Sequence, residues 1–247
     1  MKAAIAVIAI IVLAVVVWWK VSFPSGSWRY KMTVTVETPE GIKTGSAVRE
    51  ISAYSMPMFL GVNRHTHIKL EKGEAVVVDL GERGALFVLM SLGGGAGQAI
   101  GAPFNAFPSP CSRGAISRCS IKYYTNLKNT GKAELKPRFY PGMVYFKNRY
   151  DPQTVERVVE MKACPDPETG FNSHCIKADH FERVFGEGVR LKSITVEMTK
   201  EETVWTISGF LPWLKNIEAY IDGQRYGGGP ELSNILNKGD FIVGETQ

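Results

Sequence analysis

The sequence predicts a mainly β protein (α+β minor), with an N-terminal transmembrane helix followed by an antiparallel β-sheet domain that carries one or two short helices. Three observations predict this class. The first 20 residues form an apolar leader without an acidic residue, residues 30–37 alternate apolar and polar side chains, and several short strand-like segments follow at close spacing. Closely spaced short strands are typical of a sheet meander.

The N-terminal segment is expected to anchor the chain in a membrane. The run from Ala3 to Trp19 is wholly apolar, and as a helix it would rise about 25 Å at ~1.5 Å per residue. That length nearly spans a bilayer core of roughly 30 Å. Trp18, Trp19 and Lys20 supply the aromatic and basic boundary of a headgroup layer, and Lys2 can reach the other interface.

A cleavable signal peptide is the alternative, since Ser25 and Ser27 resemble a cleavage pattern of small residues. The apolar run exceeds the ~7–15 residues of a signal hydrophobic region, so we expect an uncleaved signal-anchor. Basic residues flank the run on both sides and leave its orientation open on charge alone.

The composition predicts four segments: an anchor over 1–20, a linker over 21–27, a β-rich extracytoplasmic domain over 28–226 and a Gly-rich tail over 227–247. A net charge of +5 on 247 residues excludes a polybasic nucleic-acid binder and an acidic disordered tail. No nucleic-acid partner is therefore expected, and no cofactor is expected because the sequence contains no complete phosphate- or dinucleotide-binding motif.

The first strand covers 30–37, where Tyr30 begins a buried set that alternates with polar residues. Thr38 to Gly41 reads as a turn, and an antiparallel second strand follows over 46–55. Further strands are predicted over 65–70, 74–80 and 85–92, separated by turn sequences at 72–73 and 81–84.

Residues 93–110, rich in Gly and Pro, are expected to form a long loop or lid, with one helical turn at most over 96–100. A strand over 138–146 is interrupted at Pro141-Gly142, and 151–154 fits a short helix or an edge strand equally well.

Near the C-terminus, a short amphipathic helix over 178–185 ends at Gly186 and Gly188. A strand over 189–198 follows, with a bulge between Leu191 and Ile194. Residues 211–214 form an aromatic turn on the sheet, and the chain beyond Ile221 is expected to be loosely ordered.

The four cysteines form two local pairs in Pro- and Gly-containing segments read as loops: Cys111 with Cys119, and Cys164 with Cys175. In an oxidising compartment each bridge would contribute roughly 2 to 3 kcal/mol. Their spacing does not suit a zinc knuckle. Disulfides favour a domain outside the cytoplasm; the alternative is a reversed anchor with a cytoplasmic domain and free thiols.

Residues 28–51 (WRYKMTVTVETPEGIKTGSAVREI), 184–199 (VFGEGVRLKSITVEMT) and 211–214 (LPWL) resemble the conserved stretches of an uncharacterised family of proteobacterial membrane-anchored proteins with a β-rich domain. This resemblance covers both ends of the domain and implies a bacterial origin and this architecture. It supplies no catalytic residues, and the cysteine-bearing middle lies outside it.

His65 and His67 are the sharpest chemical signal, because an i, i+2 pair on a strand projects both imidazoles to one face, where they could share a metal ion. The simpler interpretation is two solvent-facing histidines. A site needs further ligands, and the candidates are His174, His180, Asp79 and Glu71.

Other motifs are weaker. His174-Cys175 is a poor nucleophile and base pair because adjacent side chains diverge. The glycines of 93–97 match neither a P-loop nor a dinucleotide fingerprint, and Ser91 lacks the nucleophile-elbow pattern. Residues 113–136 interleave basic side chains with Tyr123 and Tyr124, which suits an anionic lipid surface or an acidic polymer.

Together these features predict a single-pass protein of the bacterial inner membrane, with its C-terminal domain in the periplasm. The expected role is a non-catalytic binding or assembly module of the envelope, whose loop over 93–136 contacts a protein partner. The alternative is a metal-dependent envelope enzyme with His65 and His67 as ligands.

Overall fold

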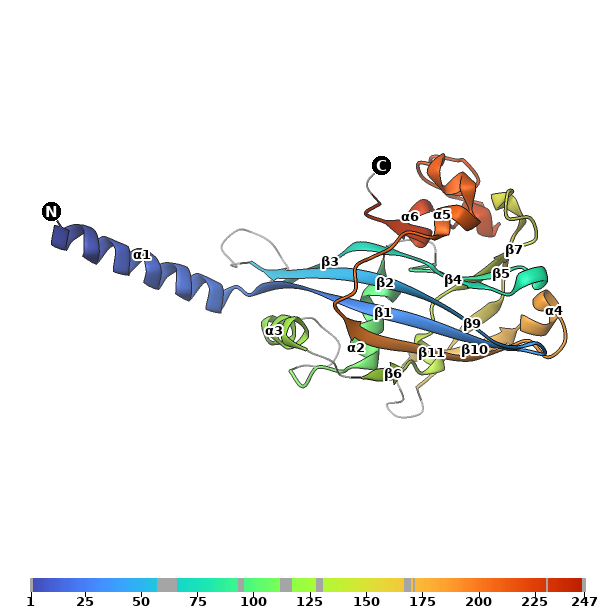
Figure 1. Cartoon of the computed structure of the whole chain (residues 1–247), viewed down its shortest axis with the longest axis horizontal. Helices are drawn as coiled ribbons and strands as arrows, with labels where there is room; N and C mark the ends of the chain where they lie inside the picture. Colours follow the sequence, from blue (N-terminus) through green and yellow to red (C-terminus); the bar gives the residue numbers. More distant parts are fainter. Residues whose placement is uncertain are drawn as a thin grey trace.

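The computed structural model describes residues 2–56, 66–92, 96–111, 117–127, 131–166, 170, 172–229 and 231–245. An extended N-terminal helix leads into a body of antiparallel sheets with a few short helices (Figure 1). The predicted class, mainly β with a leading apolar helix, is confirmed.

The leading helix, α1 (Lys2–Ser22), is long and apolar enough to cross a membrane, and no part of its apolar stretch is buried. Only two residues, Phe23 and Pro24, separate this helix from strand β1 (Ser25–Thr38). The predicted linker over 21–27 is therefore too long, because the helix continues to Ser22 and the strand takes up the small residues after Pro24.

The largest sheet has six strands in the order β12-β3-β2-β1-β11-β6. Its centre is the hairpin of β1 and β2 (Gly41–Ser55), closed by a two-residue turn with Gly41 at φ 121°. The other strands are β3 (Thr66–Glu74), β6 (Lys132–Glu134), β11 (Arg190–Thr199) and β12 (Ile242–Val243). The predicted hairpin is confirmed, as is the bulge in β11, which lies opposite Thr35 and Val36.

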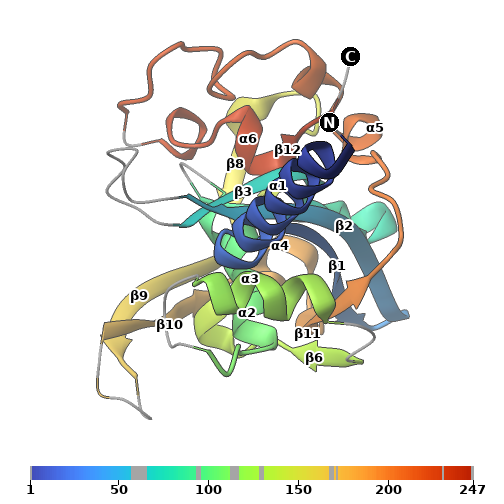
Figure 2. The same ribbon diagram turned by 90° about the vertical axis from the view of Figure 1, so that its left-hand side faces the viewer.

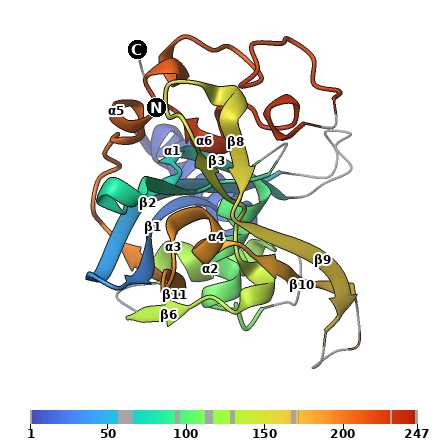
Figure 3. The same ribbon diagram turned by 90° about the vertical axis from the view of Figure 1, so that its right-hand side faces the viewer.

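A four-stranded sheet, β4-β5-β7-β8, packs against the first. Its strands are β4 (Val76–Asp79), β5 (Ala85–Val88), β7 (Met143–Phe146) and β8 (Val155–Arg157). A separate hairpin, β9 (Val159–Pro165) with β10 (Asn172–Asp179), projects from the body (Figures 2 and 3).

The helices of the body are short. They are α2 (Gly97–Ala106), α3 (Arg118–Asn126), α4 (Phe181–Phe185), α5 (Ile207–Phe210) and α6 (Lys238–Phe241), with 3-10 turns at Gly81–Arg83, Pro137–Phe139, Pro152–Thr154, Pro212–Lys215 and Leu232–Asn234.

The body has two apolar cores, one on each face of the four-stranded sheet. Alternation along β5 sends Leu86 and Val88 into the first core and Phe87 into the second. The first core lies under the six-stranded sheet with α2, α3 and α4. The second lies under the C-terminal segment, where Leu211, Leu214, Leu236 and Phe241 are buried.

The predicted loop over 93–110 is wrong for its described part, because α2 is a ten-residue helix inside the first core. Small side chains explain the discrepancy. Ala99 and Ala102 let the helix approach the sheet closely enough for the Tyr30 hydroxyl to donate a 2.5 Å hydrogen bond to the oxygen of Ala99.

The expectation of a loosely ordered chain beyond Ile221 is also wrong for residues 231–243, which return to the body and add β12 to the six-stranded sheet. Phe241 and Asp240 are buried and hold this segment on the body. The glycine content of the segment could not predict these contacts. The predicted turn at 72–73 is likewise absent, because β3 continues through Gly73 and pairs there with β12.

Candidate binding groove beside the anchor

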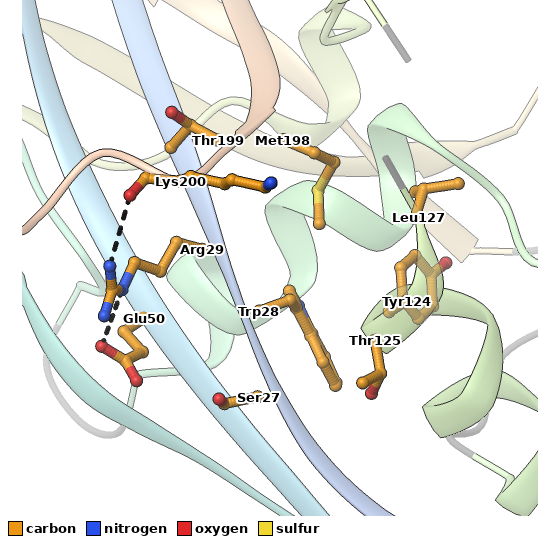
Figure 4. Close-up of a pocket in the computed structure, with 10 residues that line it drawn as sticks. All are labelled: Ser27, Trp28, Arg29, Glu50, Tyr124, Thr125, Leu127, Met198, Thr199 and Lys200. Atoms are coloured by element: carbon orange, nitrogen blue, oxygen red, sulfur yellow. Dashed lines mark hydrogen bonds and ion pairs between the residues drawn. The ribbon is translucent and has the colours of Figure 1, made fainter. Parts of the chain in front are cut away.

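A groove of about 340 Å³ lies at the end of the body from which α1 extends. It separates the start of β1 from the C-terminal half of α3, and the end of β11 together with Lys200 forms its third side (Figure 4). This volume is within the range of small-molecule sites, about 300 to 1,000 Å³. It is lined by Ser27, Trp28, Arg29, Glu50, Tyr124, Thr125, Leu127, Met198, Thr199 and Lys200.

The floor of the groove is aromatic and apolar. Trp28 occupies an inward position of β1, and its ring lies 5.5 Å from that of Tyr124 on α3. The Trp28 indole Nε1 is buried without a hydrogen-bond partner among the described residues. Met198 and Leu127 complete the apolar lining, so the floor suits a ligand with an apolar or aromatic body.

Helix α3 is held against β1 by local features of both segments. Ser117 caps the helix by accepting a 3.1 Å hydrogen bond from the Ser120 amide. Gly26 of β1 faces Thr125, and a Cβ at Gly26 would lie 2.2 Å from Thr125 Oγ1. A larger residue at position 26 would therefore force Thr125 to move, so glycine suits this close approach of α3 to β1.

Burial determines the protonation of Tyr124. Its hydroxyl donates a 2.7 Å hydrogen bond to the oxygen of Phe107. Burial, reinforced by the neighbouring Tyr123, raises the pKa of Tyr124 to about 12. Tyr124 is therefore a neutral wall of the groove at physiological pH and carries no negative charge.

The charged side chains at the rim differ in whether a ligand could pair with them. Arg29 is turned away from the floor towards Glu50, whose carboxylate it meets at 3.0 Å, and it also pairs with Glu202 at 2.6 Å. Hydrogen bonds to these two carboxylates raise the pKa of Arg29 above its usual value. Lys200 extends over the floor (Figure 4) and has no ion-pair partner among the described residues. Lys200 is thus the available charge of the groove.

A second cavity of about 260 Å³ lies on the part of the body that contains the 3-10 turn Gly81–Arg83 and β7. Its basic side chains are already engaged. Arg83 pairs with Glu40 at 2.6 Å, Lys147 pairs with Glu156 at 2.5 Å, and Arg149 donates to the Tyr150 hydroxyl at 2.7 Å. This cavity therefore offers a ligand less free charge than the groove beside α1.

Of the two predicted metal ligands, the structure describes only His67. His65 lies outside the described residues. His67 on β3 stacks on Tyr54 with ring centroids 5.0 Å apart, and its Nε2 is buried without a hydrogen-bond partner in the described part of the chain. Among the described residues, no three His, Cys, Asp or Glu side chains gather around one point. The shared metal site of His65 and His67 stays a prediction.

The candidate third ligands have other contacts. Glu71 accepts hydrogen bonds from Ser52 and Lys69 on the exposed face, Asp79 caps the Gly81 amide, and His180 lies 3.5 Å from Glu160. His174 is on the projecting hairpin.

Both predicted cysteine pairs are joined as disulfides. Cys111 is bridged to Cys119 of α3 with Cα atoms 5.8 Å apart, and Cys164 is bridged to Cys175 with Cα atoms 5.9 Å apart. The second pair was assigned to loops, whereas it joins β9 to β10.

The predicted membrane-interface aromatics are exposed at the end of α1, where the rings of Trp18 and Trp19 contact Phe23. Phe23 in turn lies under the guanidinium of Arg118, 4.8 Å from its ring centroid. The junction of α1 and the body is thus an aromatic and basic cluster.

The sequence alone does not predict the groove, because Trp28 marks only the start of the predicted domain and Lys200 lies in no predicted element. The signal that was available is the aromatic pair Tyr123-Tyr124, which the sequence placed in a contact surface. The groove exists because α3 packs beside β1, and no local sequence pattern predicts that packing.

The fold and the groove define a class of protein: an antiparallel β-sheet body that follows an apolar N-terminal helix and carries a small amphipathic groove beside that helix. The chain matches no family model, no curated protein and no solved structure.

Proposed function

We propose that this protein is a membrane-tethered, extracytoplasmic binding module that takes a small amphipathic anion in the groove beside α1. The observation that carries the proposal is the groove itself, in which an aromatic floor meets the ammonium of Lys200, a group with no ion-pair partner among the described residues. The aromatic floor would hold the apolar body of the ligand, and Lys200 would pair with its acidic group.

The charge balance at the rim supports an anion with a single negative group. Arg29 is neutralised by Glu50 and Glu202, and Lys31 by Glu201 at 2.9 Å. Lys200 remains without a carboxylate partner in the described part of the chain. A ligand with several negative groups would find only this one cation unpaired, because the carboxylates of Glu50, Glu201 and Glu202 already balance Arg29 and Lys31, so such a ligand would be disfavoured.

The compartment is part of the same proposal. The two disulfides agree with an oxidising environment, where such bridges form and persist. Joined to an apolar helix that is long enough to cross a membrane, they favour a body outside the cytoplasm. We propose the bacterial inner membrane with the body in the periplasm, in line with the family resemblance noted above and its bacterial origin.

The groove is tested with 6-fluoro-2-naphthoate, a probe with an aromatic body and one carboxylate. The full chain is reconstituted in nanodiscs, and broadening of the probe's fluorine NMR signal is compared with that over empty nanodiscs, which measure partition into lipid. Specific, saturable broadening is expected for the native chain. Lys200→Gln should weaken binding about tenfold, the loss of roughly one charge-assisted hydrogen bond.

The matched control is Lys192→Gln, since Lys192 is an exposed lysine of β11 away from the groove. Leu127→Trp, which fills the groove from its rim, should abolish saturable broadening. Broadening equal to that of empty nanodiscs, or equal affinity for native chain and Lys200→Gln, would refute the proposed site.

The compartment is tested by the intact mass of protein extracted from its own membrane with thiols trapped. A full-length mass lighter by four protons supports an uncleaved anchor and an oxidised body. A full-length mass with four alkylated thiols would place the body in the cytoplasm, and a mass without the leader would show that the anchor is cleaved.

A further inference from the structure

Helix α3 presents a basic face that the groove does not use. The exposed residues of α3 fall on one side of the helix, and the charged ones among them, Arg118 and Lys122, are both basic. The helix contains no carboxylate. Its opposite side is buried in the first core through Ser120, Ile121 and Tyr124. This division is that of a surface helix packed on a protein core, and it leaves both basic side chains on the outer side of α3, where they can meet anionic headgroups.

The position of α3 relative to α1 is specific. In Figure 1 the anchor runs lengthways and α3 is seen end-on beside its C-terminal end, whereas Figure 2, turned by 90°, shows α3 from its side. The two helices therefore lie crosswise. When α1 crosses a bilayer, α3 lies along the bilayer surface at the end of the body nearest the membrane.

Four contacts fix this arrangement. Arg118 lies 4.8 Å from the ring centroid of Phe23, the residue directly after α1, and its Nε donates a 3.1 Å hydrogen bond to Ser55 Oγ. The disulfide from Cys119 to Cys111 ties down the first turn. At the last turn, Thr125 lies directly beside Gly26 of β1. Helix α3 thus cannot swing away from the anchor without breaking packed contacts.

We infer that the basic face of α3 binds the headgroups of anionic phospholipids and holds the body against the membrane at a fixed orientation. Basic side chains near an anionic leaflet contribute about 1 kcal/mol each, or about a fivefold change in the ratio of docked to undocked body. Trp18, Trp19 and Lys20 at the end of α1 continue the same surface. This inference rests on the membrane anchoring proposed above and does not depend on the groove.

The test places a fluorescent amino acid at Asn126, an exposed position of α3, in the full chain. The chain is reconstituted in nanodiscs of phosphatidylcholine, with or without phosphatidylglycerol, that carry a lipid with a nitroxide on its headgroup. Contact quenching reports docking of α3. We expect strong quenching only with phosphatidylglycerol, and its loss at high salt, because salt screens charges at the surface.

Arg118→Gln/Lys122→Gln should lower the ratio of docked to undocked body about thirtyfold. Because Arg118 also contacts Phe23 and Ser55, Lys122→Gln alone is the variant that removes charge without a side-chain contact, and it should lower the ratio about fivefold. Lys43→Gln/Lys192→Gln removes the same charge from exposed positions on β2 and β11 and should leave quenching unchanged.

Equal quenching in the two lipids, or native quenching in Lys122→Gln, would overturn the inference and leave the anchor and the groove standing. A chain that does not enter nanodiscs at all would overturn the anchoring itself, which is a separate and visible failure.

Discussion

Arg49 Nε donates a 3.1 Å hydrogen bond to the main-chain oxygen of Glu74, while the carboxylate of Glu74 accepts hydrogen bonds from the amides of Thr206 and Ile207 at 2.8 and 3.0 Å. Both side chains are buried. Glu74 therefore links the two cores. Its carbonyl oxygen accepts a hydrogen bond from Arg49 beside the first core, and its carboxylate holds the start of α5 over the second core.

Arg49 is a buried cation whose partners are neutral. Besides Glu74, its guanidinium contacts the Tyr30 hydroxyl at 3.4 Å, the Met32 sulfur at 3.7 Å and the oxygen of Val88 at 3.4 Å. It has no ion-pair partner among the described residues. Burial raises the pKa of Tyr30 despite the opposing effect of Arg49, so Tyr30 stays neutral and serves as donor to Ala99.

We predict that Arg49→Ala lowers the free energy of unfolding by about 3 to 5 kcal/mol, because it leaves a cavity and removes the donor from buried carbonyls. Arg49→Met fills the space and should cost about 1 to 3 kcal/mol. Denaturant unfolding monitored by tryptophan fluorescence measures both. Arg190→Met, at an exposed residue, is the control, and a native-like Arg49→Ala would contradict the prediction.

The contact of Gly26 with Thr125 predicts an asymmetric double-mutant cycle. Gly26→Ala should destabilise the protein by about 1 to 3 kcal/mol, because the added Cβ would overlap Thr125 Oγ1. Thr125→Ala alone should change little, since Thr125 is exposed, and combined with Gly26→Ala it should restore most of the loss. Simple addition of the two single effects would show that α3 does not approach β1 in this way.

The projecting hairpin of β9 and β10 depends on its disulfide. An isolated two-stranded hairpin is marginal in water, and this one is tied to the body by the ion pair of Arg138 with Asp166 and by contacts of β10 with Pro137–Phe139. We predict that Cys164→Ser/Cys175→Ser reduces the free energy of opening of this hairpin by roughly 2 to 4 kcal/mol. Amide hydrogen exchange should accelerate over 159–179 and remain native in β1 and β2. Uniform acceleration would mean that the bridge stabilises the whole body.

Acid should weaken the contact between the β1-β2 turn and the 3-10 turn at Gly81–Arg83. The Arg83 guanidinium lowers the pKa of Glu40 from 4.5 to about 2. Because the folded-state pKa is depressed, the pair stabilises the protein fully above the unfolded-state pKa and loses this effect as pH falls from about 4.5 to about 2.

The measurement is the difference in stability between the native chain and Glu40→Gln as a function of pH, which should be constant above pH 4.5 and vanish near pH 2. Glu187→Gln removes an exposed carboxylate without an ion pair in the described part of the chain and serves as control. A difference that persists at pH 2 would show that Glu40 acts through something other than its charge.

The parts of the fold that the sequence predicted are those in which a local pattern and the tertiary environment agree. Alternation from Tyr30 to Val36 and the Pro39-Glu40 turn encode the central hairpin, and the skipped phase after Leu191 encodes the bulge of β11. Cysteine spacing gave both disulfides. Each of these signals lies within a few residues of the feature that it predicts.

Features that depend on distant partners were missed. The small residues of α2 have the composition of a loop. They form a helix because Ala99 and Ala102 pack in the first core under the six-stranded sheet. Arg49 is a charged residue at a buried position of a strand. Its partners lie on three other segments, so the alternation of side chains along the strand does not predict them. The groove needs Trp28, Tyr124 and Lys200 from three separate elements. Tertiary assembly, rather than propensity, determines all three.

Strand β12 closes one edge of the six-stranded sheet by pairing Ile242 and Val243 with the end of β3. The partner strand of this edge is thus about 170 residues away from β3 in the sequence. Before β12 docks, the end of β3 at Gly73 and Glu74 would present unpaired main-chain groups, and an exposed strand edge invites aggregation or chaperone capture.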